Sequence, residues 1–216
     1  MVSSQKGLTK NTMNHKFFSL PPERQQAILN AGYHVFSQNT YKKTPVSEIA
    51  AIAGISKSLL FYYFRNKQEL YVFLWKNCVQ TTIKYMNAYD CYHQTNLFEM
   101  LQRGMQAKIR IMYEYPDMGS FAIKAFYEED DAVAPAIHQI YDNFKNADAK
   151  DALEGLDPAQ FKEGLDLRMM YREMYLASEG YLWEMLRKTP LDEQGIQTIE
   201  QDFAEMIQFW KQLYLK

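Results

Sequence analysis

The sequence predicts an all-α protein, and three observations support this fold class. The chain has 216 residues with only 7 Pro and 9 Gly, which is few for a loop-rich sandwich or a glycine-rich nucleotide fold. From residue 22 onward, apolar residues recur at helical spacing and not in the alternation of strands. Hydrophobic residues make up 47% of the chain and the net charge is -2, which excludes intrinsic disorder and provides for a packed core.

The first predicted helix begins at Pro21-Pro22-Glu23, because proline fits the first turn and an acidic side chain there complements the helix dipole. We expect it to end at Asn39 or Thr40, Asn being the better left-handed cap. Its apolar stripe consists of Ile28, Ala31, Gly32, Val35 and Phe36. Residues 1–15 show no periodicity and are expected to form a flexible, weakly basic arm.

Two short helices follow, joined by a glycine turn. The Thr44 hydroxyl is expected to cap the first helix, with Pro45 in its first turn. Gly54 then supplies the positive φ of a sharp turn, and Ser56 caps the second helix, in which Tyr63 and Phe64 are expected in the core. This is a helix-turn-helix pattern, which would bring the N-terminal residues of the second helix into the DNA major groove.

The stretch TPVSEIAAIAGISKSLLFYYFRNKQEL, with the preceding ERQQAILNAGYHVFSQ, resembles the DNA-binding domain of the TetR family of transcriptional regulators over about residues 22–70. The resemblance assigns phosphate contacts to Thr44, Lys57, Tyr62 and Lys67, and contacts to base edges or sugar to Ser58, Leu59 and Phe61. Three positions depart from the family pattern. Thr40 replaces a usual glycine, Leu59 a small or hydroxylated residue, and Phe61 a frequent tyrosine.

Charge divides the chain in the same way. Residues 1–76 contain 10 Lys and Arg against 3 Glu, whereas the remaining 140 residues contain 14 basic and 23 acidic side chains. A basic head on an acidic body favours contact with DNA through the head alone. The alternative is that these charges are ordinary solvated faces.

The remaining helices are predicted near 67–90, 96–114, 117–129, 132–153, 159–188 and 192–215. We therefore expect three parts: an arm at 1–15, a helix-turn-helix DNA-binding domain at 16–66, and a helical effector-binding and dimerisation domain at 67–216. The last two would share the helix that begins near Lys67, so that a shift in the body moves the head.

The last two helices carry apolar stripes, and the TetR resemblance implies that they pair across a two-fold axis. The candidate dimer residues are Tyr181, Met185, Phe203, Ile207 and Trp210. An intramolecular core explains the same stripes. The dimer hypothesis rests on function, because a two-fold operator needs two heads about 34 Å apart.

The body also holds 10 of the 12 methionines and most aromatic residues, a composition that suits the wall of a pocket for a hydrophobic or flat ligand. The TetR resemblance implies such an effector cavity. The candidate wall residues are Tyr89, Met105, Met112, Phe126, Met170 and Met174. Ordinary core packing is again the alternative.

Other functions find less support. Cys78 and Cys91 lie about 20 Å apart in one predicted helix, too far for a disulfide, and are expected as buried thiols, with a redox role as the alternative. Neither a P-loop nor a dinucleotide fingerprint is present. The four histidines lack ligand spacing, and the acidic run Glu128–Asp131 is expected to be solvated. We expect no enzyme activity, cofactor, metal or membrane span.

The sequence therefore predicts a cytoplasmic one-component repressor. It would bind a palindromic double-stranded operator as a homodimer and be released by a small hydrophobic or aromatic effector. Two alternatives stay open: a ligand-independent activator or architectural DNA-binding protein, and a helical-bundle carrier or enzyme without specific DNA binding.

Overall fold

The structure, a computed structural model, describes residues 14–91, 94, 96–151, 156–188 and 192–216. Within these residues the chain forms α-helices, a short 3-10 turn at Pro158–Gln160 and an isolated β-bridge between Phe161 and Leu215. The predicted all-α fold is confirmed. In the part of the chain described here, no helix is long and apolar enough to cross a membrane.

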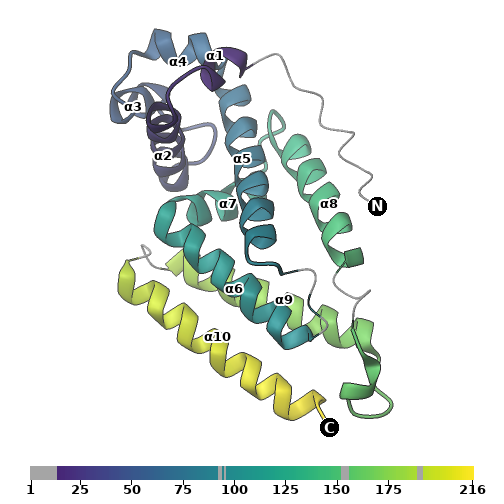
Figure 1. Cartoon of the computed structure of the whole chain (residues 1–216). Coiled ribbons are helices and arrows are strands. Elements are labelled where there is room, and N and C mark those ends of the chain that lie inside the picture. The colour runs from purple at the N-terminus through teal and green to yellow at the C-terminus, as the bar shows by residue number, and fades with distance from the viewer. Residues whose placement is uncertain (1–13, 92–93, 95, 152–155, 189–191) are drawn as a thin grey trace.

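The helices are α1 (His15–Phe18), α2 (Pro22–Gln38), α3 (Val46–Ile52), α4 (Lys57–Tyr63), α5 (Lys67–Ala88), α6 (Leu97–Glu114), α7 (Met118–Phe126), α8 (Ala134–Asp151), α9 (Leu167–Lys188) and α10 (Glu193–Tyr214). Helices α1–α4 form one end of the molecule, which we call the head, and α5 runs from it into the remaining helices, which we call the body (Figure 1). At the opposite end, α10 lies beside α6 and α9.

The N-terminal helix α1 was not predicted. Phe17 is 1% exposed and its ring lies 5.2 Å from that of Phe64 and 5.1 Å from that of Phe73. Residues 14 and 15 therefore belong to the folded head, although the sequence placed them in the arm. The rest of that predicted arm, residues 1–13, lies outside the described residues.

Several predicted helix ends differ from the structure, and the difference is largest at the start of α9. Asn39 follows α2 as predicted, but its backbone is extended (φ -127°) and its side-chain amide donates to the Val35 carbonyl oxygen at 2.9 Å. Helix α9 starts at Leu167 instead of residue 159. There the Asp166 carboxylate accepts hydrogen bonds from the first free amides, after the positive φ of Gly164 has turned the chain.

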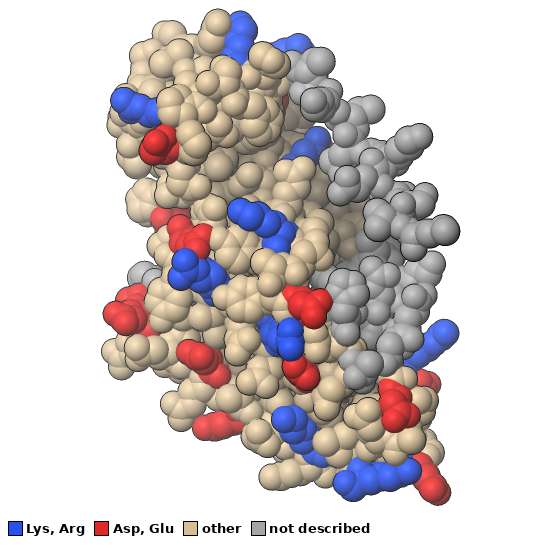
Figure 2. Space-filling view, viewed as in Figure 1, with Lys and Arg blue, Asp and Glu red and all other residues tan. Residues whose placement is uncertain are grey.

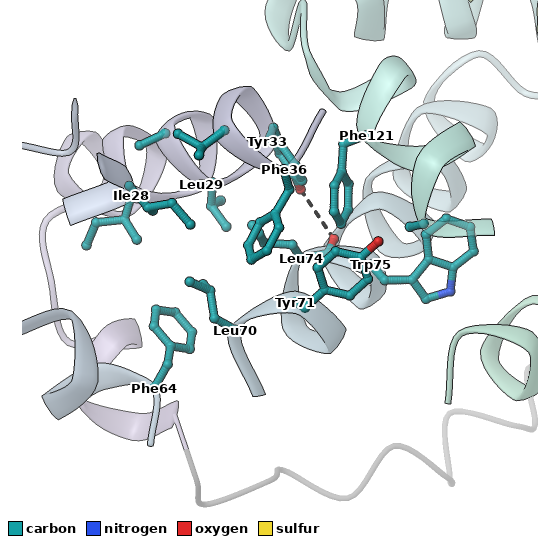
Figure 3. Packing of buried hydrophobic residues seen from close by; sticks show 14 of the residues in the cluster. Ile28, Leu29, Tyr33, Phe36, Phe64, Leu70, Tyr71, Leu74, Trp75 and Phe121 are labelled. Atoms are coloured by element: carbon teal, nitrogen blue, oxygen red, sulfur yellow. Dashed lines mark hydrogen bonds between the residues drawn. The ribbon is translucent and has the colours of Figure 1, made fainter. Parts of the chain in front are cut away.

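One apolar core joins the head to the body. Phe36 and Tyr71 pack edge to face with centroids 4.8 Å apart, and Phe121 of α7 lies against both rings (Figure 3). The Tyr33 hydroxyl of α2 donates to Asn77 Oδ1 of α5 at 2.6 Å. Because α2, α5 and α7 share these buried contacts, the head is fixed on the body by packing and not by a linker.

A second core lies between α6, α9 and α10 and corrects part of the dimer prediction. Phe203, Ile207 and Trp210 are each at most 4% exposed within the single chain. The stripe of α10 is therefore covered by α6 and α9 of its own chain and offers no surface to a partner. The apolar stripe of α10 thus forms part of an intramolecular core, which was the alternative to a dimer interface.

Candidate DNA-contacting helix and body cavity

Helix α4 is held by local interactions that the sequence predicts. Gly54 has φ +67° in the turn before it, and the Ser56 hydroxyl accepts a hydrogen bond from the Leu59 amide at 3.1 Å. Leu60 and Tyr63 are buried against the rest of the head. The opposite face of this short helix is thereby fixed toward solvent.

The exposed face of α4 carries most of the predicted DNA contacts. Lys57 and Ser58 are exposed, and Leu59 and Tyr62 are 37% and 57% exposed. Phe61 is half-buried and packs against the head core. The face mixes a cation, a hydroxyl and apolar edges, which are groups that contact phosphates and base edges in a major groove.

Two lysine side chains lie over aromatic rings of α4. The Lys16 ammonium of α1 is 3.6 Å from the centre of the Tyr62 ring, and Lys57 Nζ is 5.9 Å from that of Phe61. In Figure 2 the head carries Lys and Arg side chains with few acidic neighbours, while the body mixes both signs. The charge division of the sequence thus appears on this face of the folded surface.

Thr44 and Lys67 are placed differently from their predicted roles. Thr44 is 4% exposed, and its hydroxyl donates to the Thr40 carbonyl oxygen at 2.8 Å instead of capping α3. Lys67 Nζ donates to the Lys42 carbonyl oxygen at 3.0 Å and lies 4.8 Å from the centre of the Tyr41 ring. Both side chains hold the loop between α2 and α3, and the Thr44 hydroxyl proton is already donated to the Thr40 carbonyl oxygen.

A cavity of about 250 Å³ lies in the body among α5, α6, α7 and α9, with contributions from α8. Its wall is mainly apolar and aromatic, and it includes Trp75, Met105, Met112, Tyr171, Tyr175 and Trp183. Of the six predicted wall residues, the structure places Met105 and Met112 on the cavity. Both come from the same face of α6, each within about one turn of Lys108, which also lines it.

The other four predicted wall residues do not line this cavity. Met170 and Met174 are buried in the core with α6 and α10, one position away from Tyr171 and Tyr175, which do face the cavity. The remaining two also lie elsewhere: Phe126 packs against Tyr141 and Trp183, and Tyr89 packs beside Met86 and Ala107. The sequence therefore identified the right helix in α9 but the wrong face.

The cavity has few polar groups, and sequence reasoning missed the important ones. Lys108 Nζ donates to Glu179 Oε1, and each side chain is 25% exposed. The Ser178 hydroxyl donates to the Met174 carbonyl oxygen at 2.7 Å, and Trp75 Nε1 finds no hydrogen-bond partner among the described residues. The sequence did contain one indication of a polar group in the cavity wall, because Lys108 lies between Met105 and Met112 on an otherwise apolar helix face.

The two cysteines are free and buried, as predicted, although α5 ends at Ala88, before Cys91. Burial raises the pKa of the Cys78 thiol to about 12. Among the residues placed by the structure, no group of three or more His, Cys, Asp or Glu side chains could hold a metal ion.

The outer face of the last two helices is apolar at several positions. Leu176 is 54% exposed on α9, and Phe209 and Leu213 are 61% and 46% exposed on α10. The predicted dimer residue Tyr181 is half-buried, with its hydroxyl donating to Asp202 Oδ2 at 2.6 Å, and Met185 is half-buried in the second core. The exposed apolar residues of α9 and α10 are thus different from the residues that the sequence predicted for the dimer interface.

Comparison with known proteins gives one family. The model of bacterial regulatory proteins of the tetR family matches residues 28–72, which run from α2 into α5. The fatty acid metabolism regulator protein of Bacillus subtilis (strain 168) is 23% identical over 142 residues, or 66% of this chain and 73% of that protein. The transcriptional regulator RutR of Escherichia coli (strain K12) is 43% identical over 49 residues, 23% of each chain.

The fold also has solved relatives. The structure of the regulator FadR from Bacillus subtilis in complex with stearoyl-CoA has a TM-score of 0.61 and 20% identity, and the match covers 84% of this chain and 96% of that one. At this identity the likeness extends to the fold, including the helical body beyond the matched head.

Proposed function

Since the chain belongs to the TetR family of bacterial regulatory proteins, we propose that it is a repressor whose homodimer binds a palindromic operator. Residues 16–66 would bind DNA, and residues 67–216 would hold the dimer surface and a small apolar effector that releases the operator. The observation that carries this proposal is the continuity of α5, which begins beside α4 and lines the body cavity with Trp75 and Val79.

The distance along α5 supports coupling between cavity and head. Trp75 lies eight residues after Lys67, or about 12 Å along the helix axis. Lys67 in turn contacts the loop before α3. An effector that displaces the Trp75 side chain would therefore move the start of α5 and the loop it holds, and a shift of a few ångströms between two heads is enough to misplace one half-site.

The proposed dimer uses the outer face of α9 and α10 around Leu176, Phe209 and Leu213. These side chains are large, apolar and about half exposed, which is unfavourable for a single chain and favours a covering partner. A two-fold operator requires both heads on the same side of the dimer, so the proposal places the two-fold axis through this face.

The proposed effector class follows from the cavity wall. Its lining is mainly apolar and aromatic, which suits a hydrophobic molecule with few polar atoms. The FadR relative in complex with stearoyl-CoA supports a carbonyl-containing acyl compound as one member of this class.

The first test is binding of the purified protein to DNA from immediately upstream of its own gene, with a scrambled duplex as control, at two salt concentrations. The proposal expects preference for the native fragment that survives moderate salt, because sequence-specific contacts add to the salt-sensitive phosphate attraction. Equal binding to both duplexes would contradict autoregulation at that site. No binding to either would favour the ligand-binding bundle without DNA function.

A further inference from the structure

We propose that the body cavity takes a neutral, compact, apolar ligand and that Trp75 Nε1 donates a hydrogen bond to an acceptor oxygen of this ligand. The proposal names the ligand class of the same cavity and so rests on the proposed function for its biological role. Its physical basis is separate, because it concerns the polar atoms of the cavity and not DNA.

Trp75 supplies the principal observation. The residue is 5% exposed, and its indole nitrogen is the one buried side-chain polar atom without a hydrogen-bond partner among the residues that the structure describes. Trp75 lines the cavity, and Figure 3 shows its ring projecting away from Tyr71 and Phe121 with the nitrogen at the far edge. Buried N–H groups are nearly always paired in native proteins, so this donor indicates an absent acceptor.

The serine and threonine hydroxyl groups of the cavity wall, Ser178 and Thr82, do not compete for this role. Ser178 donates to the Met174 carbonyl oxygen at 2.7 Å, and Thr82 donates to the Cys78 carbonyl oxygen at 2.9 Å. Each hydroxyl has thus placed its single proton within its own helix. A ligand oxygen that enters the cavity would be received by the indole N–H.

The charge of the cavity argues against an anionic ligand. Lys108 and Glu179 are both three-quarters buried and form an ion pair with each other, so this part of the wall has no net charge. A carboxylate ligand would have to separate the pair or remain uncompensated among apolar side chains, and either outcome is costly at low dielectric. An ester, ketone or thioester carbonyl offers the acceptor without the charge.

The volume limits the size of the ligand. About 250 Å³ equals roughly eight water molecules at about 30 Å³ each, which is room for a molecule of about ten non-hydrogen atoms. Bulky side chains such as Tyr171, Tyr175 and Trp183 occupy the surrounding space. A ligand that is held wholly within this space is therefore expected to be smaller than a long acyl chain.

Three probes of matched size separate these claims in calorimetric titrations of the full-length protein. Methyl heptanoate carries a neutral ester, its isomer octanoate carries a charge, and butylbenzene has no strong acceptor. We expect methyl heptanoate to bind more tightly than octanoate. Trp75→Phe should weaken methyl heptanoate about five-fold, as expected for one neutral hydrogen bond, and should change butylbenzene less than about two-fold, since only packing is altered.

Two further variants complete the experiment. Trp183→Phe removes an indole from the same wall and is the matched control, in which the ester should lose no more affinity than butylbenzene does. Glu179→Gln leaves the Lys108 charge unpaired, so octanoate should become the tighter ligand of the two isomers. This reversal remains a test even if Trp75→Phe fails to fold, which circular dichroism would reveal.

The proposal is overturned if the ester binds equally well to the wild type and to Trp75→Phe, if octanoate is the tighter ligand of the wild type, or if none of the probes binds the folded protein. Failure of the proposed function has a different signature. In that case the ester binds as expected through Trp75, yet the protein has no specific DNA affinity or the bound ester leaves operator binding unchanged.

Discussion

Glu128 is expected to hold the head in place from the body. It lies between α7 and α8, and its Oε2 accepts a hydrogen bond from the backbone amide of Tyr41 at 2.7 Å, while its Oε1 accepts from the Asp130 amide at 3.2 Å. Tyr41 belongs to the loop between α2 and α3, and its ring is buried against Tyr71. Glu128→Ala would leave the partly buried Tyr41 amide without its acceptor.

The size of the effect follows from this geometry. A hydrogen bond to a charged group contributes about 1.5–3 kcal/mol, and Glu128 is half-buried, so the lower end applies. We expect Glu128→Ala to reduce the free energy of unfolding by about 1.5 kcal/mol, which lowers Tm by about 3–6 °C in a chain of this size. Glu128→Gln keeps an acceptor oxygen and should lose about half as much.

Urea unfolding and fluorescence anisotropy with operator DNA provide the assay. Operator affinity should fall in Glu128→Ala because the loop before α3 loses its support, while the salt dependence stays unchanged because no phosphate contact is removed. Glu129→Ala is the control, since it removes the same charge from an exposed neighbour. Equal stability of the two variants would refute the reasoning that this hydrogen bond ties head to body.

Further substitutions test the head, the core and the dimer surface. Ser56→Ala removes the cap of α4 and should cost about 1 kcal/mol in urea unfolding, with weaker operator binding. Lys57→Ala should weaken binding to all sequences and lower the salt slope by about one phosphate, whereas Ser58→Ala should alter sequence preference, both measured by anisotropy at several salt concentrations. Burial raises the pKa of the Cys78 thiol from its ordinary value near 9 to about 12. The thiol ionises first in the unfolded chain, so its contribution to the free energy of unfolding should be constant below about pH 9 and fall as pH rises toward 12, as the difference between wild type and Cys78→Ala in urea titrations at each pH would show. Phe209→Glu places a charge on the exposed apolar face of α10 and should convert dimer to monomer in sedimentation. A dimer that is indifferent to this change would place the interface elsewhere.

The head could be predicted in detail because its determinants are local. The positive φ of Gly54 and the Ser56 cap act within three or four residues of where they stand, and the prediction of each was confirmed. The prediction that Thr44 caps α3 is wrong, because its hydroxyl makes a different hydrogen bond. The Thr40 carbonyl oxygen accepts the hydrogen bond of the Thr44 hydroxyl where the loop folds back. The preference of threonine for helix N-caps does not indicate that this other acceptor lies within reach.

The sequence predicts the helices of the body but not which neighbour each helix face contacts. In α9, Met174 enters the core, Tyr175 faces the cavity and Leu176 points to solvent, although all three are apolar and adjacent. Successive residues turn about 100° around a helix, so each faces a different neighbour, and their common hydrophobicity does not reveal which one. Only the packed positions of α6 and α10 separate these roles.

Lys67 illustrates a related ambiguity at the head. The TetR resemblance assigned Lys67 to a phosphate contact, yet its ammonium binds the Lys42 carbonyl oxygen and lies over the Tyr41 ring. The backbone amide of Tyr41 also donates a hydrogen bond to Glu128 Oε2. The loop before α3 is thus held from α5 and from the body at once. A change at Lys67 would disturb the position of the helix-turn-helix as well as any phosphate contact. Weaker DNA binding by Lys67→Ala therefore shows that Lys67 contacts a phosphate only if the salt dependence of binding also falls.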